Sequence, residues 1–242
     1  LEDTLLKHKP DEELEKIIRI ITSEFIKKYE KKVINEVISG KRTLRFSNYI
    51  SKMYIPNNGL PIITTNYDRL IEFSCEIQGI PVDNMFVGRY FGIVDEEKSR
   101  WSFYKSSSKL PKTRNIKLEY HKRVKVYKPH GCLSWYRYKD IPISTLYDLE
   151  IENLIITPGL NKFRAGYEQP FDIHREKANK AIDAAGKFII IGYGFNDPHL
   201  ETHLIAKIKR GIPTLIITKS LSENAKKIVR EFNNVLALTF ET

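Results

Sequence analysis

Polar residues that could act on a substrate follow short apolar runs at four places in the sequence. These residues are Asn66, Asp68, His130, the turn 192–197, Thr218 and Lys219. In parallel α/β sheets, ligands bind beyond the carboxyl ends of the strands. If the four apolar runs are strands of one such sheet, the polar residues are expected to converge on a single crevice.

His130 is the strongest candidate for acid–base chemistry. A histidine titrates near neutral pH and can take a proton from a sugar hydroxyl. Pro129 and Gly131 on either side would hold its ring in a fixed place. The alternative is a buried histidine with a purely structural role. Asn66 and Asp68 share a turn on which both side chains can face a ligand, and their alternative role is to cap the following helix.

The glycine turn is suited to a phosphate. Gly192 and Gly194 allow close approach of the backbone, and a helix that begins near Pro198 offers free N–H groups. A tight strand-to-helix turn would explain the glycines equally well. His199 and His203 have a spacing that can bind metal, but no third ligand is evident. We therefore predict no metal site.

The rest of the pattern indicates how these residues are positioned. Residues 11–39 predict one amphipathic helix, or two in succession, because apolar residues recur every three or four positions. Strands are predicted at 60–65, 124–127, 153–157, 187–191, 214–217 and 235–239, and helices at 43–53, 69–78, 171–185, 198–210 and 222–232. This alternation predicts an α/β fold: a Rossmann-like parallel sheet with helices on both faces. We predict a single domain over 1–242, with 84–128 as a small inserted basic lobe.

Composition narrows the class of protein. Of 242 residues, 41% are hydrophobic and 29% are charged, which is typical of a soluble globular protein. No apolar stretch approaches the ~20 residues of a membrane span. Two cysteines cannot form a four-thiolate zinc site, so no zinc is expected. Lone thiols favour a reducing compartment, which makes the cytoplasm the expected location.

The positive charge is concentrated in one segment. Residues 98–128 hold eleven basic residues and one acidic residue, Glu119, and this excess of ten equals the net charge of the whole chain. Among these cations lie the aromatic residues Trp101, Phe103, Tyr104 and Tyr120, a mixture used to bind single-stranded nucleic acid. The alternative is a solvated loop.

Three ordered motifs together resemble the sirtuin-like family of NAD-consuming domains, in particular the bacterial branch of anti-phage defence proteins. They are Thr64-Thr65-Asn66-Tyr67-Asp68, Lys128-Pro129-His130-Gly131 and Gly192-Tyr193-Gly194-Phe195-Asn196-Asp197. The resemblance covers roughly two thirds of the chain, from Pro61 to Thr218.

The resemblance implies residue roles in cleavage of the nicotinamide–ribose bond of NAD. His130 would act as general base on the nicotinamide ribose, Asn66 would position water or the ribose, and Asp68 would bind the nicotinamide end. The remaining NAD contacts would come from Thr65, Tyr67, Gly192, Tyr193, Gly194, Phe195, Asn196, Thr218 and Lys219.

The sequence departs from the family pattern in two respects. The glycine–alanine–glycine–serine loop that cradles the pyrophosphate is not found, and we expect the chain to begin after it. The zinc cysteines of protein-deacetylating sirtuins are missing, which counts against peptide deacetylation.

The resemblance predicts an NAD glycohydrolase that uses NAD as substrate and acts as the effector of a defence system. A homo-oligomer and a partner protein or fused sensor domain would control it. The alternatives are a catalytically silent module that senses NAD or a nucleotide, a nucleic-acid-binding assembly module acting through 98–128, and a metal-dependent hydrolase that uses His199 and His203.

Overall fold

The computed structural model describes residues 12–106, 118–157 and 168–240. They form a mixed α/β structure that divides into two compact units, residues 1–175 and 176–242. The helix α7 (Phe171–Ala184) spans the boundary between the two units. Among the residues described, no helix is long and apolar enough to cross a membrane. The assignment of 1–242 to a single domain stays a prediction.

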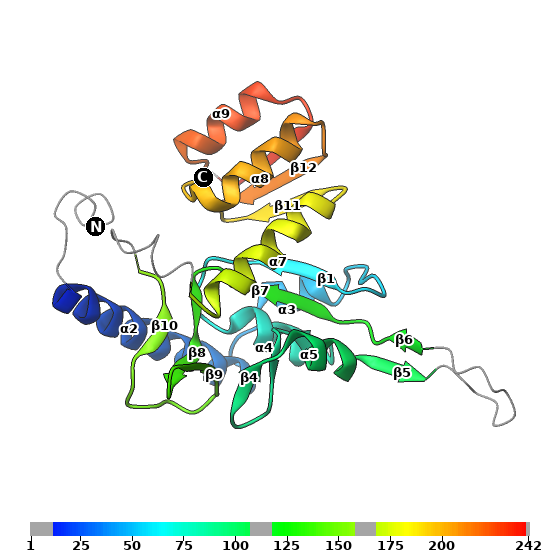
Figure 1. Cartoon of the computed structure of the whole chain (residues 1–242). Helices are drawn as coiled ribbons and strands as arrows, with labels where there is room; N and C mark the ends of the chain where they lie inside the picture. The colour runs from blue at the N-terminus through cyan, green and yellow to red at the C-terminus, as the bar shows by residue number, and fades with distance from the viewer. Residues whose placement is uncertain (1–11, 107–117, 158–167, 241–242) are drawn as a thin grey trace, which may run out of the picture. The chain divides into compact units, whose positions relative to one another are not determined.

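The first unit holds a parallel sheet, an antiparallel sheet and a two-stranded ribbon (Figure 1). The parallel sheet has the spatial order β1 (Leu60–Ile63), β7 (Val124–Tyr127) and β2 (Val82–Asp83). The antiparallel sheet has the order β10 (Asn153–Ile155), β8 (Gly131–Tyr138), β9 (Ile141–Ser144), β4 (Gly92–Val94) and β3 (Phe86–Val87). The ribbon consists of β5 (Tyr104–Ser106) and β6 (Leu118–Tyr120). The helices are α2 (Glu12–Ile38), α3 (Arg45–Ile50), α4 (Leu70–Glu76) and α5 (Glu96–Ser102).

Two apolar clusters hold these sheets in place. The cluster under the parallel sheet contains the fully buried Val124 and Val126 of β7 with Ile50 and Cys75 from α3 and α4. The second cluster joins β8, β10 and α7 through residues such as Trp135 and Phe171. β-Branched and aromatic side chains suit these positions because they pack well against a pleated surface.

The antiparallel sheet was not predicted from the sequence. The segment 84–128 contains α5 and several short strands, and those strands are shared among three sheets. The strand predicted at 153–157 exists as β10, but it pairs antiparallel with β8. In β8 the first six residues are all buried, so its sequence lacks the alternation by which a half-buried strand is recognised.

The second unit is the part that the sequence pattern describes best. Its strands β11 (Phe188–Ile191), β12 (Thr214–Thr218) and β13 (Val235–Thr239) form a parallel sheet, connected by α8 (Pro198–Lys209) and α9 (Glu223–Glu231). The strand order follows the chain, and right-handed crossovers then place both connecting helices on one face. Ile190 and Ile216 on that face are buried, whereas Ile191 on the other face is 53% exposed.

The parallel strands therefore lie in two three-stranded sheets, one in each unit. This arrangement differs from the continuous sheet covered by helices on both faces that the sequence predicts. The structure confirms the α/β character and the parallel pairing of the strands. The described residues do not show one continuous parallel sheet.

Candidate functional site

Two of the predicted site loops leave the parallel sheet of the first unit at neighbouring strand ends. β1 and β7 pair in parallel with Ile63 opposite Tyr127, and the Thr64 amide donates to the Tyr127 carbonyl at 3.0 Å. The turn with Asn66 therefore begins beside the loop that carries His130. Asn66 is exposed and His130 is half-buried, so both can be reached by a ligand.

A buried lysine ties these two loops together. The Lys128 side chain is 2% exposed, and its ammonium group donates to the carbonyls of Asn66, at 3.4 Å, and of Asp68. It also lies 3.3 Å from the Glu72 carboxylate. Burial alone would lower the pKa of Lys128, but Glu72, Cys132 and Asp68 together outweigh that effect and leave the pKa above its ordinary value. Lys128 is therefore charged and fixes the backbone beneath Asn66.

His174 anchors the same loop from α7. The Lys128 amide donates to His174 Nδ1 at 3.1 Å, and the imidazole packs against Trp135 with ring centroids 4.5 Å apart. Complete burial, and then the positive charge of Lys128, lower the pKa of His174 to about 3. His174 is therefore neutral near pH 7 and serves as a hydrogen-bond acceptor.

This histidine should make the protein sensitive to acid. The pKa of His174 is lowered in the folded state, so between about pH 6.5 and 3 the unfolded chain binds one proton more than the folded chain. Stability should fall as the pH falls through that window, by at most about 1.4 kcal/mol per pH unit from this group. We expect His174→Asn, which keeps an acceptor but cannot titrate, to flatten the slope in urea unfolding curves at pH 4 to 7.

His121 provides the matched control for that measurement because its side chain is exposed. His121→Asn should retain the slope of the parent protein. If His174→Asn also retained it, another group would be responsible for the acid sensitivity.

The His130 loop is fixed to β10 by backbone contacts. The Ile156 amide donates to the His130 carbonyl at 2.8 Å. Gly131 has a φ of +94°, and a Cβ atom there would lie 2.2 Å from the Leu154 carbonyl oxygen. Only glycine fits at this position, which explains the histidine–glycine pair in physical terms.

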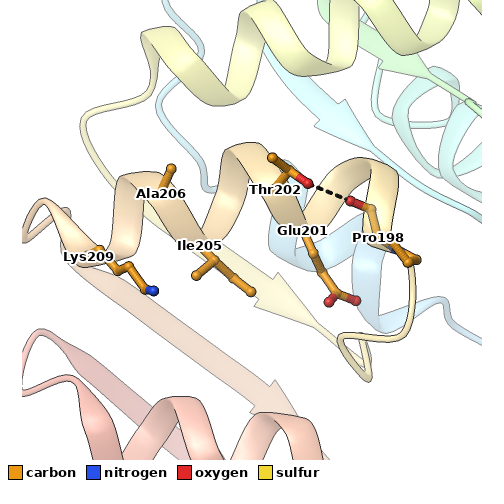
Figure 2. Close-up of a pocket in the computed structure, with 6 residues that line it drawn as sticks. All are labelled: Pro198, Glu201, Thr202, Ile205, Ala206 and Lys209. Atoms are coloured by element: carbon orange, nitrogen blue, oxygen red, sulfur yellow. Dashed lines mark hydrogen bonds between the residues drawn. The ribbon is translucent and has the colours of Figure 1, made fainter.

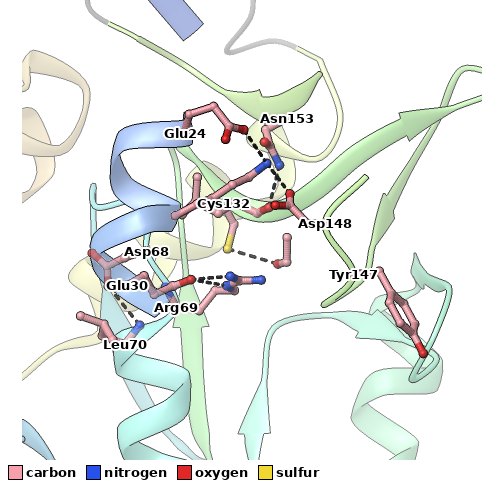
Figure 3. A network of polar contacts seen from close by, with 12 residues as sticks. Glu24, Glu30, Asp68, Arg69, Leu70, Cys132, Tyr147, Asp148 and Asn153 are labelled. Atoms are coloured by element: carbon pink, nitrogen blue, oxygen red, sulfur yellow. Dashed lines mark hydrogen bonds and ion pairs between the residues drawn. The ribbon is translucent and has the colours of Figure 1, made fainter. Parts of the chain in front are cut away.

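The turn after β1 is fixed by its own side chains and by α2. Asp68 Oδ1 accepts from the Leu70 amide at 3.0 Å, so one of its oxygens forms an Asx turn at the start of α4, whose N-cap residue is Arg69. The Tyr67 hydroxyl donates to the Ile156 carbonyl at 2.6 Å. Figure 3 shows the ion pair of Arg69 with the buried Glu30 of α2, whose Nε to Oε2 distance is 2.9 Å.

The glycine turn of the second unit follows β11 and lies beside the end of β12. The Gly192 amide donates to the Ile217 carbonyl at 2.9 Å. The start of α9 holds the turn: Ser222 Oγ donates to the Gly194 carbonyl at 2.6 Å, and Asn224 Nδ2 donates to the Phe195 carbonyl at 2.8 Å. Sequence analysis did not identify Ser222 or Asn224, because each is an ordinary polar residue at a helix start.

The predicted NAD-binding residues differ in what they can offer a ligand. The Phe195 side chain is fully buried. The Tyr193 hydroxyl is also buried, and burial, followed by the Glu201 and Asp197 carboxylates, raises the pKa of Tyr193. Exposed positions are Gly192, Asn196 and Lys219, and Thr218 and Thr65 are half-buried. In the turn, therefore, a ligand can reach backbone and amide groups more readily than aromatic rings.

The N-terminus of α8 is less suited to a phosphate than the sequence indicates. Asp197 Oδ1 accepts from the His199 amide at 3.1 Å, and Glu201 Oε1 accepts from the Asp197 amide at 2.6 Å. This reciprocal cap places two carboxylates where an anion was expected.

The histidine pair on α8 does not assemble a metal site in the part of the chain that the structure describes. His203 Nδ1 lies 2.9 Å from Asp183 Oδ1. In the described ranges, no group of three or more histidine, cysteine or acidic residues could hold a metal ion. A shallow hollow on α8, lined by Pro198, Glu201, Thr202, Ile205, Ala206 and Lys209, is built from this one helix and includes none of the predicted site residues (Figure 2).

The basic segment uses part of its charge and its aromatic rings internally. Arg123 is buried, pairs with Asp83 at 3.1 Å, and lies over the Tyr120 ring at 4.7 Å. The Tyr120 ring in turn packs on Tyr104, with centroids 4.1 Å apart. Four further cations of the segment, Lys109, Lys112, Arg114 and Lys117, lie outside the described residues.

Comparison with known families tests the resemblance that the three motifs suggest. A family model described as a SIR2-like domain matches residues 61–235. The chain belongs to this family. The SIR2-like domain thus includes β1 with Asn66, the His130 loop and the glycine turn, and its family consists generally of NAD-dependent enzymes. A search of curated proteins gave no match.

Proposed function

We propose that this SIR2-like domain is an NAD glycohydrolase, which converts NAD and water to nicotinamide and ADP-ribose. The observation that carries the proposal is the arrangement of Asn66 and His130 on adjacent loops of one parallel sheet, joined by the buried Lys128. A carboxamide and an imidazole at neighbouring strand ends provide what hydrolysis at a sugar carbon requires: a group that orients water and a group that accepts its proton.

In the proposed reaction, the bond between the ribose anomeric carbon and the nicotinamide nitrogen breaks, and its electron pair leaves with nicotinamide. The ribose then carries a cationic, oxocarbenium-like centre, which electrostatic contacts in the site stabilise. Asn66 positions the water that adds to this carbon, and His130 accepts a proton from the ribose hydroxyl or the water. Asp68, with one carboxylate oxygen engaged at α4, binds the nicotinamide end.

The remaining predicted residues would bind the rest of the dinucleotide. Thr65 and Tyr67 belong to the turn with Asn66. Gly192 and Gly194 would present backbone amides to the phosphates, together with Tyr193, Phe195 and Asn196. Thr218 and the cationic Lys219 would contact the adenosine side. Because the Phe195 ring is buried, its contribution would come from the backbone.

We further propose that the domain acts as the effector of an anti-phage defence system, dormant until a partner protein or a fused sensor domain activates it. Consumption of NAD would be harmful if it were continuous, so an active glycohydrolase requires such control. The alternative is a catalytically silent domain that binds NAD as a signal.

The test is incubation of the full protein with NAD, with released nicotinamide followed by chromatography and NAD binding followed by calorimetry. Time-dependent release of nicotinamide is the expected result. Binding without release would favour the silent sensor, and neither binding nor release would contradict both.

A further inference from the structure

The long helix α2 presents a row of large apolar side chains to solvent. Leu14, Ile17, Ile21 and Phe25 are 44%, 45%, 63% and 62% exposed. Their spacing of three and four residues places them on one face of the helix, which we name the α2 stripe. A contiguous apolar surface of this kind is characteristic of an interaction site.

The opposite face of α2 is attached to the first unit by polar contacts. Ser23 and Glu30 are buried on that face, Glu30 pairs with Arg69, and Arg19 pairs with Glu152 at 2.6 Å. Half-buried apolar residues such as Ile26 and Val33 accompany these polar contacts. The apolar residues of α2 are therefore divided between the covered side of the helix and the exposed stripe. Among the residues of the first unit that the structure describes, the stripe side chains thus remain largely exposed.

Formal charge along α2 identifies what can cover the stripe. Residues 12–25 contain four acidic and two basic residues, a net charge of −2. Residues 26–38 contain four basic and two acidic residues, a net charge of +2. A second α2 packed in parallel would bring like charges together, whereas an antiparallel α2 brings each acidic half against a basic half.

We propose that the protein forms a twofold-symmetric dimer in which the α2 stripes of two copies pack antiparallel. With Ile21 on the symmetry axis, Ile17 lies opposite Phe25 of the second copy, and Glu13 lies near its Lys28. Antiparallel helix pairs commonly pack in this way, and a twofold interface is self-complementary. The two helices alone form a small interface, so the dimer should be reversible and dependent on concentration.

The stripe contains none of the predicted NAD-binding residues and lies on the face of α2 opposite Glu30, the residue that contacts the turn after β1. The proposal is therefore tested separately from catalysis.

Sedimentation velocity of the full protein over a concentration series provides the first test. We expect a monomer–dimer equilibrium, and Ile21→Lys should weaken it roughly 30-fold, as removal of a central interface residue does. The control is Ile38→Lys, because Ile38 is on the same helix and 72% exposed but lies about 100° around the axis from Ile21. Circular dichroism melting curves should match for both variants. A protein that remains monomeric at all concentrations, or a dimer indifferent to Ile21→Lys, would overturn the proposal.

Charge exchange tests the antiparallel direction. Glu13→Lys and Lys28→Glu should each weaken the dimer, and the double variant should restore it because the opposite charges again face each other. In a parallel pair, position 13 would face position 13, and the double variant would not be restored.

Cross-linking tests the register. Both native cysteines, Cys75 and Cys132, are buried, so a cysteine introduced at position 21 should be the reactive one. Ile21→Cys should form a disulfide-linked dimer on mild oxidation, and Ile38→Cys should not. Equal cross-linking of the two variants would contradict the register.

Discussion

Lys128→Met should both destabilise the protein and strongly slow the proposed cleavage of NAD. Lys128 is buried and Glu72 is 15% exposed, and the lysine ammonium group bonds to two carbonyls of the Asn66 turn. Removing one member of a buried ion pair leaves the other charge without a counter-charge, which lowers the free energy of unfolding by about 3–5 kcal/mol. Chemical denaturation should show that loss, and any folded Lys128→Met protein should cleave NAD far more slowly because the Asn66 carbonyl is no longer held.

The double variant Lys128→Met/Glu72→Gln separates the two effects. Burial disfavours the charged form of Glu72 and raises its pKa. Replacing it with a neutral amide should recover part of the lost stability, although not the activity. If Glu72→Gln recovered no stability in the Lys128→Met background, the two side chains would not be acting as a pair.

Gly131→Ala should be among the most damaging single substitutions in the first unit. The backbone at Gly131 has a φ of +94°, and an added Cβ would lie 2.2 Å from the Leu154 carbonyl oxygen and 2.9 Å from Phe171 Cε1. Backbone strain and overpacking each destabilise a protein by about 1–3 kcal/mol. Together they should lower the free energy of unfolding by about 3–5 kcal/mol or prevent folding. The measurement is the free energy of unfolding in urea.

Gly79 is the matched control, because its φ is +68° but a Cβ atom there would meet nothing within 4 Å. Gly79→Ala should lower the free energy of unfolding through backbone strain alone, by about 1 kcal/mol. Equal losses at the two positions would mean that the close approach of β10 to Gly131 is not the cause.

The parallel strands could be predicted from the sequence because the pattern that identifies each strand lies within it and in the residues directly beside it. The run 187–191 is apolar, is followed by a glycine turn, and precedes a proline at a helix start, and all of these are local features. The neighbouring positions of Asn66 and His130 followed from the rule that ligands bind beyond strand ends.

The features that could not be predicted depend on contacts between distant segments. Nothing in the sequence around Lys128 indicates that its charge is buried against Glu72, which is 56 residues earlier in the chain. The same holds for His174, whose neutral ring accepts from the Lys128 amide. The outward orientation of the α2 stripe was missed because periodicity indicates a helix face but not which face the protein covers.

If Asn66 and His130 carry out cleavage of the nicotinamide–ribose bond, replacing either one should slow nicotinamide release, which can be compared among the full protein, Asn66→Ala and His130→Ala. Each substitution should lower the rate by roughly 100- to 10,000-fold, as loss of a positioned proton acceptor or water-orienting group does, while melting curves remain close to that of the parent. Release of nicotinamide by both variants at the parent rate would contradict the account.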